Sequence, residues 1–482
     1  MALQAAAFVY FGWTYSLLPI AAETRLARGP YLQALLDTSV EVVWLTDVPS
    51  TGAVRWHEEG GQDAVEAEST PGAVHRVKLT GLKPGVVHGY QVLDGDRALT
   101  DETFRFRTSP AIGTGEIHVA VAGDSGDGSD EELAVAALIR GLEPDIFVHT
   151  GDYDYAHDLD RSVFGPYRDV ISRACFYPSR GNHDFWVQWR EVFFPPNAPE
   201  TADAMYYSFD WGSAHFAALD TNFDGIAGGD ELRWLEADLD KAKAAGTKWL
   251  ILFFHEPPYT VGGYSLFLRV AHEVIPPIAD RFGVDLVLSG HDHNYQRSHP
   301  TRGEVVHDAW QSPAFVSPRG TIYLVSGGGG RQLYGEVDSS DHRFTQLFIG
   351  EHHALELVIT AAEIKVRALS PAMVVLDEFT ITKDRPRPPY EFIRGDADLT
   401  GALNLSDSVH ILGQLFQGAA PECPFAGSVV SDADGSGKVE ITDAIYLLRY
   451  LFLGGPPPPA PFPECETVPD ADEAWCARGC LR

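Results

Sequence analysis

The sequence is poor in cysteine, with only five in 482 residues. No two of them form a C-x-x-C pair, which argues against a cysteine-based structural zinc site. Cys175 stands alone in an apolar stretch, which is typical of a buried small side chain rather than a nucleophile. The other four predict one or two disulfides and an oxidising compartment, with three full pairings open; they are Cys423, Cys465, Cys476 and Cys480.

Basic side chains are scarce as well. The chain has 36 Lys and Arg against 68 Asp and Glu, for a formal net charge of −32. Such a charge argues against nucleic acid or an anionic membrane surface as the main partner, because their phosphates would be repelled. If the substrate is itself an anion, something other than net charge has to attract it, and a cluster of metal ions could do so.

Long apolar runs are almost absent. The exception is Ala2–Ala22, and we interpret residues 1–22 as a secretory signal peptide. No Lys or Arg precedes this run, so an uncleaved membrane anchor is the alternative. No later stretch of the sequence is long and apolar enough to span a bilayer. Apolar residues still make up 45% of the chain, and its length predicts a folded protein of two to four domains.

Short strand-sized runs separated by turns occupy residues 25–110. Ser39–Thr46 alternates in polarity, and three comparable runs follow without any helical stretch: Gly52–His57, His75–Leu79 and His88–Leu93. This pattern predicts a β-sandwich of fewer than about 100 residues.

From residue 115 to 383 the pattern changes to apolar strands that end abruptly in polar residues. Five such endings begin at Gly123, Gly151, Gly181, His255 and Gly290. Between them lie helical patterns at Leu133–Leu142, behind a Ser129-x-x-Glu132 capping box, and at Asp230–Ala245. Alternating strands and helices predict a layered α/β domain with its polar residues gathered where the strands end.

Six side chains at these strand ends are oxygen or nitrogen donors that suit iron, zinc or manganese. They are Asp124, Asp152, Asn182, His255, His291 and His293. Two carboxylates on neighbouring strands will not both stay ionised side by side without a cation between them. Two metals that share one carboxylate meet this requirement and hold a hydroxide for in-line attack on phosphorus. Any one of these residues could equally be a turn or a loop cap, but the ordered set indicates a metal site.

The ordered blocks resemble the calcineurin-like metallophosphoesterase superfamily, and within it the purple acid phosphatases. The distinguishing residue is Tyr155 in the segment Gly151-Asp-Tyr-Asp-Tyr155. The resemblance covers residues 25–383. It implies a fibronectin type III-like β-sandwich at 25–110 and a four-layer α/β catalytic domain at 115–383, in which a β-sandwich is flanked by helices.

The resemblance also implies ligands and a cofactor. Ferric iron would be bound by Asp124, Asp152, Tyr155 and His293. A second metal, divalent iron, zinc or manganese, would be bound by Asp152, Asn182, His255 and His291. The phenolate would colour the protein, and the metal charges would keep the site cationic for phosphate. His183 would hydrogen-bond the phosphoryl group and protonate the leaving alkoxide; the alternative is that it only caps its loop.

One stretch departs from the family. The plant-type enzymes carry further histidines shortly after the block of His255, whereas residues 257–264 contain none. Tyr259, Tyr264 and Arg297 are candidates for the missing substrate contacts. Asp184 is a candidate for orienting His183.

A Pro-rich, charged segment at 384–394 is typical of a linker, and a Pro/Cys-rich tail occupies 456–482. Between them, Asp396 and Asp432 begin two copies of a repeat in which oxygen donors have calcium-loop spacing and an apolar helix follows. The predicted calcium ligands are Asp396, Asp398, Thr400, Ala402, Asn404, Asp407, Asp432, Asp434, Ser436, Lys438, Glu440 and Asp443.

These repeats, at 395–455, resemble dockerin modules more than full EF-hands. The resemblance implies a small α domain that binds calcium and docks onto a partner such as a cohesin-like domain or a cell-surface component. The alternative is an acidic, solvated linker.

Together these features predict a multidomain acid phosphatase, secreted or at the cell surface. It would hydrolyse phosphate monoesters, on phosphorylated small molecules or phosphoproteins, by attack of a metal-bound hydroxide. Two alternatives stay open: a phosphodiesterase of the same superfamily, and a non-catalytic surface binding or scaffold protein.

Overall fold

The computed structural model divides the chain into two compact units, Met1–Lys383 and Asp384–Arg482. The residues it describes are 23–67, 71–185, 189, 192–199, 205–222, 229–263, 269–337, 339–383, 391–398, 400, 402–417, 430–436, 438–460, 462 and 466–467. The predicted signal peptide, Tyr264, residues 384–390 of the predicted linker and the four C-terminal cysteines lie outside this set. Within it, no helix combines the length and apolar character needed to cross a membrane.

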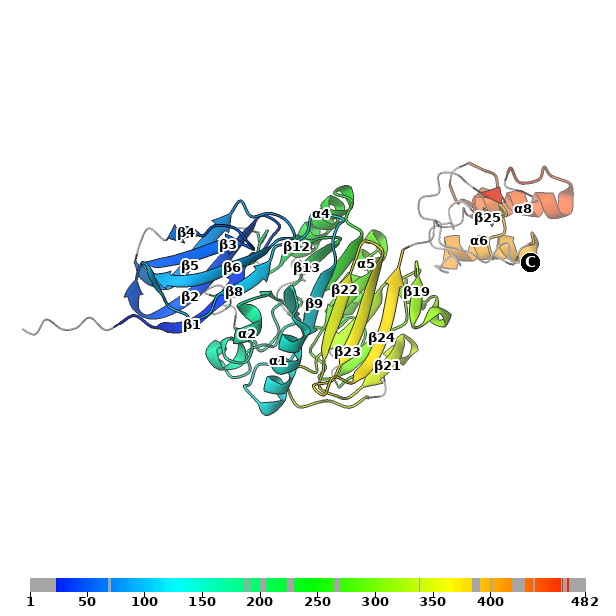
Figure 1. Ribbon diagram of the computed structural model, residues 1–482. Helices are drawn as coiled ribbons and strands as arrows, with labels where there is room; N and C mark the ends of the chain where they lie inside the picture. Colours follow the sequence, from blue (N-terminus) through cyan, green and yellow to red (C-terminus); the bar gives the residue numbers. More distant parts are fainter. Residues whose placement is uncertain are drawn as a thin grey trace, which may run out of the picture. The chain divides into compact units, whose positions relative to one another are not determined.

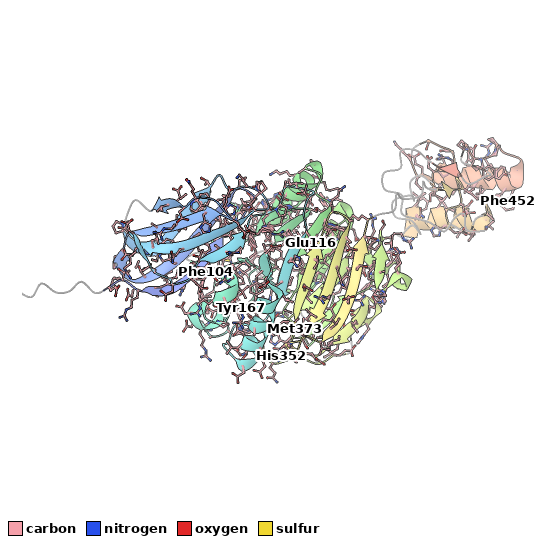
Figure 2. All side chains as sticks on the ribbon, viewed as in Figure 1. Phe104, Glu116, Tyr167, His352, Met373 and Phe452 are labelled. Atoms are coloured by element: carbon pink, nitrogen blue, oxygen red, sulfur yellow. The ribbon has the colours of Figure 1, made fainter. Side chains whose placement is uncertain are left out.

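Residues 26–107 form two antiparallel sheets (Figure 1). One sheet has the order β1 (Leu26–Gln33), β2 (Ser39–Ser50), β5 (Gly72–Thr80), and the other has the order β4 (Ala64–Ala67), β3 (Gly52–Glu58), β6 (Val87–Asp94), β7 (Arg97–Ala98), with β8 (Phe104–Arg107) also paired to β6. Trp44, Val54 and Phe104, the last labelled in Figure 2, share one core because alternate side chains face inward. The predicted β-structure is confirmed, and its fibronectin type III-like character stays a prediction.

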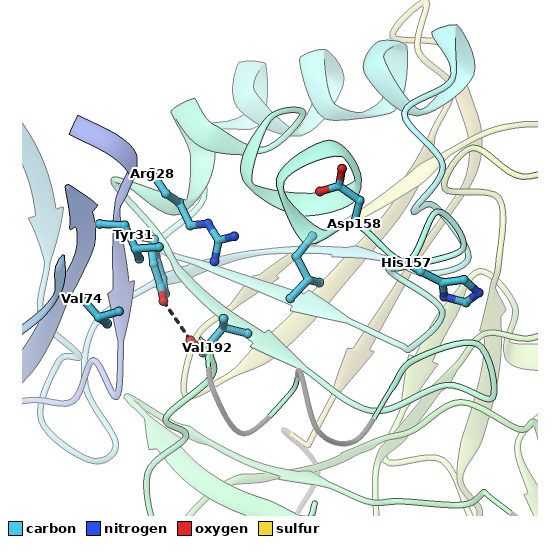
Figure 3. A pocket seen from close by; sticks show the side chains of 8 residues that line it. Arg28, Tyr31, Val74, His157, Asp158 and Val192 are labelled. Carbon is cyan, nitrogen blue, oxygen red and sulfur yellow. Dashed lines mark hydrogen bonds between the residues drawn. The ribbon is translucent and has the colours of Figure 1, made fainter. Parts of the chain in front are cut away.

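Direct hydrogen bonds fasten this β-rich region to the rest of its unit. The guanidinium of Arg28 donates two hydrogen bonds to Asp160, at 2.5 and 2.6 Å, and the Tyr31 hydroxyl donates to the Val192 carbonyl at 3.0 Å. A cleft of about 480 Å³ lies along this boundary (Figure 3). It is lined by Arg28, Tyr31, Leu45, Val74, His157, Asp158, Leu159 and Val192, and by none of the predicted metal donors.

Two seven-stranded sheets form the central part of the unit (Figure 1). The first has the order β11 (Cys175–Pro178), β10 (Ile146–His149), β9 (Ile117–Ala122), β22 (Ala354–Ile359), β23 (Glu363–Leu369), β24 (Val375–Thr382), β19 (Ala314–Val316). The second has the order β12 (Tyr207–Trp211), β13 (Ala214–Ala218), β14 (Trp249–Phe253), β15 (Leu286–Ser289), β20 (Ile322–Ser326), β16 (Tyr295–Ser298), β21 (Thr345–Ile349). A small hairpin pairs β17 (Thr301–Arg302) with β18 (Val305–Val306). Cys175 is buried in β11, as predicted.

Helices cover the outer faces of both sheets. In β14, Ile251 packs in the core between the sheets, and its neighbours Leu250 and Leu252 pack in a second core with α4 (Asp230–Ala244) and α5 (Arg269–Phe282). On the other side, α1 (Asp130–Leu142) packs against the first sheet, with the short helices η1 (Asp160–Phe164) and α2 (Arg168–Ile171) beside it. Two further short helices are η3 (Ala309–Gln311) and η4 (Ser340–Arg343). The predicted layered α/β domain is confirmed.

The predicted capping box before α1 is only half formed. The Ser129 hydroxyl accepts from the backbone N–H of Glu132 at 3.2 Å, as a helix cap should. The Glu132 carboxylate does not return to Ser129; it accepts from the backbone N–H groups of Asp127 and Gly128 instead, at 3.1 and 2.6 Å. The helix therefore also fixes the loop that leads from β9.

Parallel strands bring the predicted donors to one edge. β9, β10 and β11 run parallel, with Ala122, His149 and Pro178 aligned at their carboxyl ends. In the second sheet β13, β14, β15 and β20 are also parallel. The predicted donors lie on the loops that follow β9, β10, β11, β14 and β15. Ligand sites in such sheets form where parallel strands end, so these loops are the expected place for a site.

The described residues of the C-terminal unit include the helices α6 (Leu405–Gln417) and α8 (Ile441–Leu453) and a two-stranded sheet of β25 (Glu391–Phe392) and β26 (Glu466–Thr467). Ile411 of α6 and Leu447 of α8, which occupy equivalent positions in the repeat, meet in a small core with Ala397, Ala433 and Ala444. The last part of the predicted linker is thus a strand of this unit. Dockerin-like identity stays a prediction.

Candidate metal centre

Tight turns aim the donors into one space. Asp124, Asp152 and His291 have φ values of 56°, 55° and 69°, a left-handed conformation that costs non-glycine residues about 1 kcal/mol or more. Glycine is required beside them: a Cβ on Gly290 would lie 2.5 Å from Oδ2 of Asp124, and one on Gly181 would collide with the Asp152 carboxylate. The strain and the close packing both indicate a functional site.

The first group of donors surrounds the phenol oxygen of Tyr155. This oxygen lies 2.7 Å from Oδ2 of Asp152, 3.0 Å from Nε2 of His293 and 3.4 Å from Oδ1 of Asp124. The Nδ1–H of His293 donates to the carbonyl of Gln332 at 2.7 Å, so its Nε2 presents a lone pair to the group. One hydroxyl hydrogen cannot satisfy three acceptors. A cation at the centre of the four residues would.

The second group lies on the other side of Asp152. Nε2 of His255 is 3.0 Å from Oδ1 of Asn182 and 3.0 Å from Nδ1 of His291, and His291 Nδ1 is 2.9 Å from the Asn182 oxygen. His255 donates its Nδ1–H to the Thr150 carbonyl at 2.9 Å, so Nε2 of the neutral ring would present its lone pair to a cation. Ligands about 2.1 Å from a common cation at right angles are about 3 Å apart, which is the spacing found here.

Electrostatics also favour cations. Burial raises the pKa of Asp124. For Asp152 burial acts in the same direction, but the positive charge that His255 carries when it is protonated outweighs burial and lowers the pKa. Burial, and then the charges of Asp124 and Asp152, raise the pKa of Tyr155 far above its usual value. The phenolate form of Tyr155 therefore requires a cation beside it.

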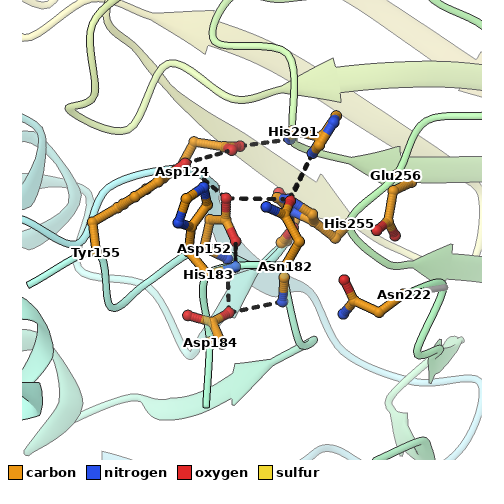
Figure 4. A network of polar contacts seen from close by, with 12 residues as sticks. Asp124, Asp152, Tyr155, Asn182, His183, Asp184, Asn222, His255, Glu256 and His291 are labelled. Carbon is orange, nitrogen blue, oxygen red and sulfur yellow. Dashed lines mark hydrogen bonds and ion pairs between the residues drawn. The ribbon is translucent and has the colours of Figure 1, made fainter. Parts of the chain in front are cut away.

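Figure 4 shows six of the seven predicted metal donors in this cluster, with His183 at its edge, and the seventh, His293, joins them through its contact with Tyr155. The backbone N–H of His183 donates to Oδ1 of Asp152 at 2.8 Å, and its ring centroid is 4.4 Å from that of Tyr155. Asp124, Asp152 and His255 are within reach of a single ion. The donors fit a pair of metal ions, which the carboxylate of Asp152 would share.

Asp184 does not orient His183. Its two carboxylate oxygens accept from four backbone N–H groups, at 2.7 to 3.1 Å, and so tie together the loops that carry Asp152 and Asn182. The four donors are Asp152, Tyr153, Asp154 and Gly181. The expectation was wrong because the spacing along the chain does not show that Asp184 faces away from the imidazole, into the backbone of β10's loop.

Two candidates for the missing substrate contacts are excluded by their positions. Tyr259 is 4% exposed and packs among His272, Tyr323 and Phe344. Arg297 is also 4% exposed and its guanidinium binds the Asp377 carboxylate. Both side chains are buried and committed to partners within the protein.

Arg331, which the sequence did not suggest, lies beside the donors instead. Its guanidinium carbon is 4.3 Å from the centroid of the Tyr155 ring. The only local signal for it is its place directly after the four glycines 327–330.

The two C-terminal loops have matching geometry. Asp396, Asp398 and Asp407 place one carboxylate oxygen each within 4.8 Å of one another, and Asp432, Asp434 and Asp443 do the same. Corresponding hydrogen bonds recur: Asp407 accepts from the Asn404 N–H and Asp443 from the Glu440 N–H, both at 2.8 Å. The repeat seen in the sequence is therefore also a repeat in structure, and calcium binding by it stays a prediction.

The predicted metal donors lie within a segment that matches a known protein family. Residues 117–295 match the family described as calcineurin-like phosphoesterase. The chain carries a calcineurin-like metallophosphoesterase domain. The match begins at β9 and ends at β16, so it contains every donor of the cluster.

Curated relatives of the metallophosphoesterase domain include purple acid phosphatases. The chain is 26% identical to purple acid phosphatase 15 of Arabidopsis thaliana over 312 residues, which is 56% of each protein. It is 26% identical to human acid phosphatase type 7 over 333 residues, 61% of this chain and 75% of the relative. The chain thus spans little more than half the length of the Arabidopsis relative.

Solved structures show the same fold. The purple acid phosphatase PPD1 from yellow lupin seeds superposes with a TM-score of 0.65 at 21% identity, over 75% of this chain and 74% of that one. A structure of PhoD superposes with a TM-score of 0.52 at 14% identity, over 73% of this chain and 90% of that one. The predicted resemblance to the superfamily and to its purple acid phosphatase branch is confirmed at the level of the domain and its fold.

Proposed function

We propose that this protein is a secreted, dinuclear metal-dependent acid phosphatase that hydrolyses phosphate monoesters. The observation that carries the proposal is the position of one oxygen, Oδ2 of Asp152. It lies 2.7 Å from the Tyr155 hydroxyl and 3.3 Å from Nε2 of His255. An oxygen between two groups of donors suits two cations that share a carboxylate. The purple acid phosphatases among the relatives support the same reaction.

The two donor groups differ in the ion they favour. A phenol oxygen with two carboxylates favours trivalent iron, and the group with two imidazoles and an amide favours divalent iron, zinc or manganese. When bound, these ions would polarise a phosphoryl oxygen and activate a water molecule. The respective donors are Asp124, Asp152, Tyr155 and His293, and Asp152, Asn182, His255 and His291.

His183 is placed to act on the leaving group. Its backbone is held by Asp152 and its ring lies against Tyr155, while the residue is exposed to solvent. An imidazole in this position can bind a phosphoryl oxygen and donate a proton to the departing alkoxide oxygen. The substrates would be phosphorylated small molecules or phosphoproteins, since nothing in the described part of the site requires a larger nucleic acid ligand.

Turnover of two model substrates tests the proposal. Protein purified with iron and zinc or manganese should hydrolyse p-nitrophenyl phosphate faster than bis(p-nitrophenyl) phosphate, and His183→Ala should reduce that rate without loss of bound metal. Faster turnover of the diester would show that the protein is a phosphodiesterase and not a monoesterase. Metal-replete protein with neither activity would make the domain a non-catalytic binding module.

We also propose that the C-terminal unit binds calcium and docks onto a cohesin-like or cell-surface partner outside the cell. Support comes from the two acidic loops and from exposed apolar side chains that recur at equivalent positions of both helices. On α6 these are Leu405, Val409 and Phe416, and on α8 they are Ile441, Ile445 and Phe452. An apolar surface of this kind on a small domain suits a protein partner.

A further inference from the structure

The backbone of Arg331 is hydrogen-bonded to one of the predicted metal donors. Its N–H donates to the carbonyl of Asp124 at 3.1 Å, and its guanidinium lies over the ring of Tyr155. The arginine is thus fixed directly to one predicted donor and stacked on another. Its position depends on the same loops that position the metal donors.

The glycines before Arg331 explain this close approach. A Cβ on Gly327 would lie 2.8 Å from Oδ2 of Asp124, and a Cβ on Gly329 would collide with the carbonyl of Gly123. Only glycine lets the segment lie against the loop of Asp124. Arg331 is the first side chain after that segment, so its location is set by backbone packing rather than by a flexible loop.

The guanidinium keeps donors available beyond its ion pair. One terminal nitrogen donates to Oδ2 of Asp127 at 2.5 Å, and Asp127 is itself held by the Ser129 N–H at 2.9 Å. Nε of Arg331 is buried and meets no acceptor among the described residues, and the side chain is 35% exposed. A guanidinium has five N–H donors in a planar fork that matches two oxygens of a phosphate. A single carboxylate contact leaves most of that capacity unused.

We propose that Arg331 is a further catalytic residue, which binds an oxygen of the phosphoryl group in the substrate and in the product phosphate. The inference rests on the proposed function. It supplies a cationic contact in a chain whose residues 257–264 contain no histidine and whose Arg297 is bound to Asp377. Asp127 holds the guanidinium in place through one terminal nitrogen and leaves the other N–H donors for phosphate.

The alternative is that Arg331 and Asp127 form an ion pair that only stabilises the loop. The two possibilities predict opposite results for the two partners. If the pair is structural, breaking it from either side has the same effect. If Arg331 binds phosphate, removing Arg331 weakens binding, whereas removing the charge of Asp127 releases the guanidinium and removes a repulsive carboxylate from beside the site.

The experiment measures the affinity of the metal-loaded full chain for inorganic phosphate, by competitive inhibition and by calorimetry. Arg331→Met keeps the apolar stem over Tyr155 and should weaken phosphate binding about tenfold or more, because charge-assisted hydrogen bonds are lost. Arg331→Lys introduces an ammonium, which is a point charge without the planar fork, and its phosphate affinity should lie between those of the wild type and of Arg331→Met. Asp127→Asn should bind phosphate as tightly as the wild type or more tightly. Metal content and the thermal midpoint of each variant are measured alongside.

Equal weakening in Arg331→Met and Asp127→Asn, or unchanged affinity in Arg331→Met, would overturn the assignment. If the methionine variant does not fold, Arg331→Lys and Asp127→Asn still decide, since only a phosphate contact predicts weaker phosphate binding in the first variant and not in the second. Wild-type protein that binds phosphate but cleaves no monoester would overturn the proposed function and leave the Arg331 contact standing. Monoester cleavage with phosphate affinity that is insensitive to Arg331 would do the reverse.

Discussion

The hydroxyl of Tyr155 lies 2.7 Å from Oδ2 of Asp152. The same carboxylate oxygen is 3.3 Å from Nε2 of His255, which belongs to the other group of donors. A phenol, a shared carboxylate and an imidazole in this arrangement link two donor groups through one atom. The chemistry expected of the centre depends on this link.

Tyr155→Phe should remove the colour of iron-loaded protein and preserve the fold. The substitution deletes the phenol oxygen, which is the expected source of charge transfer to ferric iron, but keeps the ring that His183 and Arg331 contact. Visible absorption and circular dichroism of both proteins, at matched iron content, measure the two effects. Retained colour would show that Tyr155 is not an iron ligand.

Asp184→Asn should lower the affinity of the centre for metal, although Asp184 is not itself a predicted metal ligand. An amide would set an NH₂ group against backbone N–H donors and lose part of the four-bond contact that joins the loops of Asp152 and Asn182. Loss of such a supporting contact lowers metal affinity about 10- to 100-fold. Metal retained after dialysis against a weak chelator measures this loss.

Asp158→Asn is the matched control for Asp184. Asp158 also accepts two backbone N–H groups, from Asp160 and Arg161 at 3.1 and 3.4 Å, but it is exposed, and the two groups that it binds belong to η1, which carries no predicted donor. Its substitution should leave metal retention unchanged. Equal loss in both variants would mean that Asp184 has no special part in holding the centre.

The stability of the folded chain should fall between about pH 6.5 and pH 9 because of His215. Burial lowers the pKa of His215, but the carboxylates of Asp210 and Asp238, at 2.8 and 2.9 Å, outweigh burial and raise it to about 9. The protonated ring therefore stabilises the fold fully below about pH 6.5, its usual pKa, and this contribution is lost as the pH rises through about 9. Its size is on the order of 3 kcal/mol.

Denaturant midpoints of the wild type and of His215→Gln, measured across this range, check the prediction. The variant should be less stable at pH 6 and should lack this part of the decline. His118→Gln is the control, because His118 is 3.0 Å from Glu116 but both side chains are exposed and such pairs contribute little. A variant whose stability declines as steeply as that of the wild type would contradict the role given to His215.

Calcium should bind at two sites of the full chain, and Asp443→Ala should weaken one of them about tenfold or more, because affinity of such loops depends on their carboxylates. Asp443 is the most deeply buried member of the second acidic group and also accepts from the N–H of Glu440 in the cap of α8. Calorimetric titration and amide exchange in Ile441–Leu453 report both effects. Asp240→Ala, which removes an exposed charge from α4, should leave the titration unchanged. Two intact sites in Asp443→Ala would exclude the second loop as a calcium site.

The local sequence indicated that the predicted donors would lie close together, and there is a physical reason for this. A strand that ends in glycine and a polar residue already encodes the turn, and parallel strands place such turns at one edge. Asp124, Asp152 and His255 therefore meet as the sequence indicated. Tyr155 and His293 join them through the segments that follow the same strands.

Contacts between distant segments could not be predicted in this way. The sequence offered Tyr259 and Arg297 as substrate contacts, and both side chains proved to be buried. It did not offer Arg331, whose place depends on how closely the glycines 327–330 approach the loop of Asp124. It also misassigned Asp184, whose partners are backbone groups of another loop.

The sequence by itself determined which residue types stand at the strand ends, the layered α/β order and the acidic repeat, because strands, turns and repeats are encoded over short distances. Only the tertiary structure decided that Asp152 stands between two groups of donors and that an arginine lies over the tyrosine. Those relationships arise when strands from two different sheets end at a common edge, and side-chain packing across that edge is not encoded in any one segment.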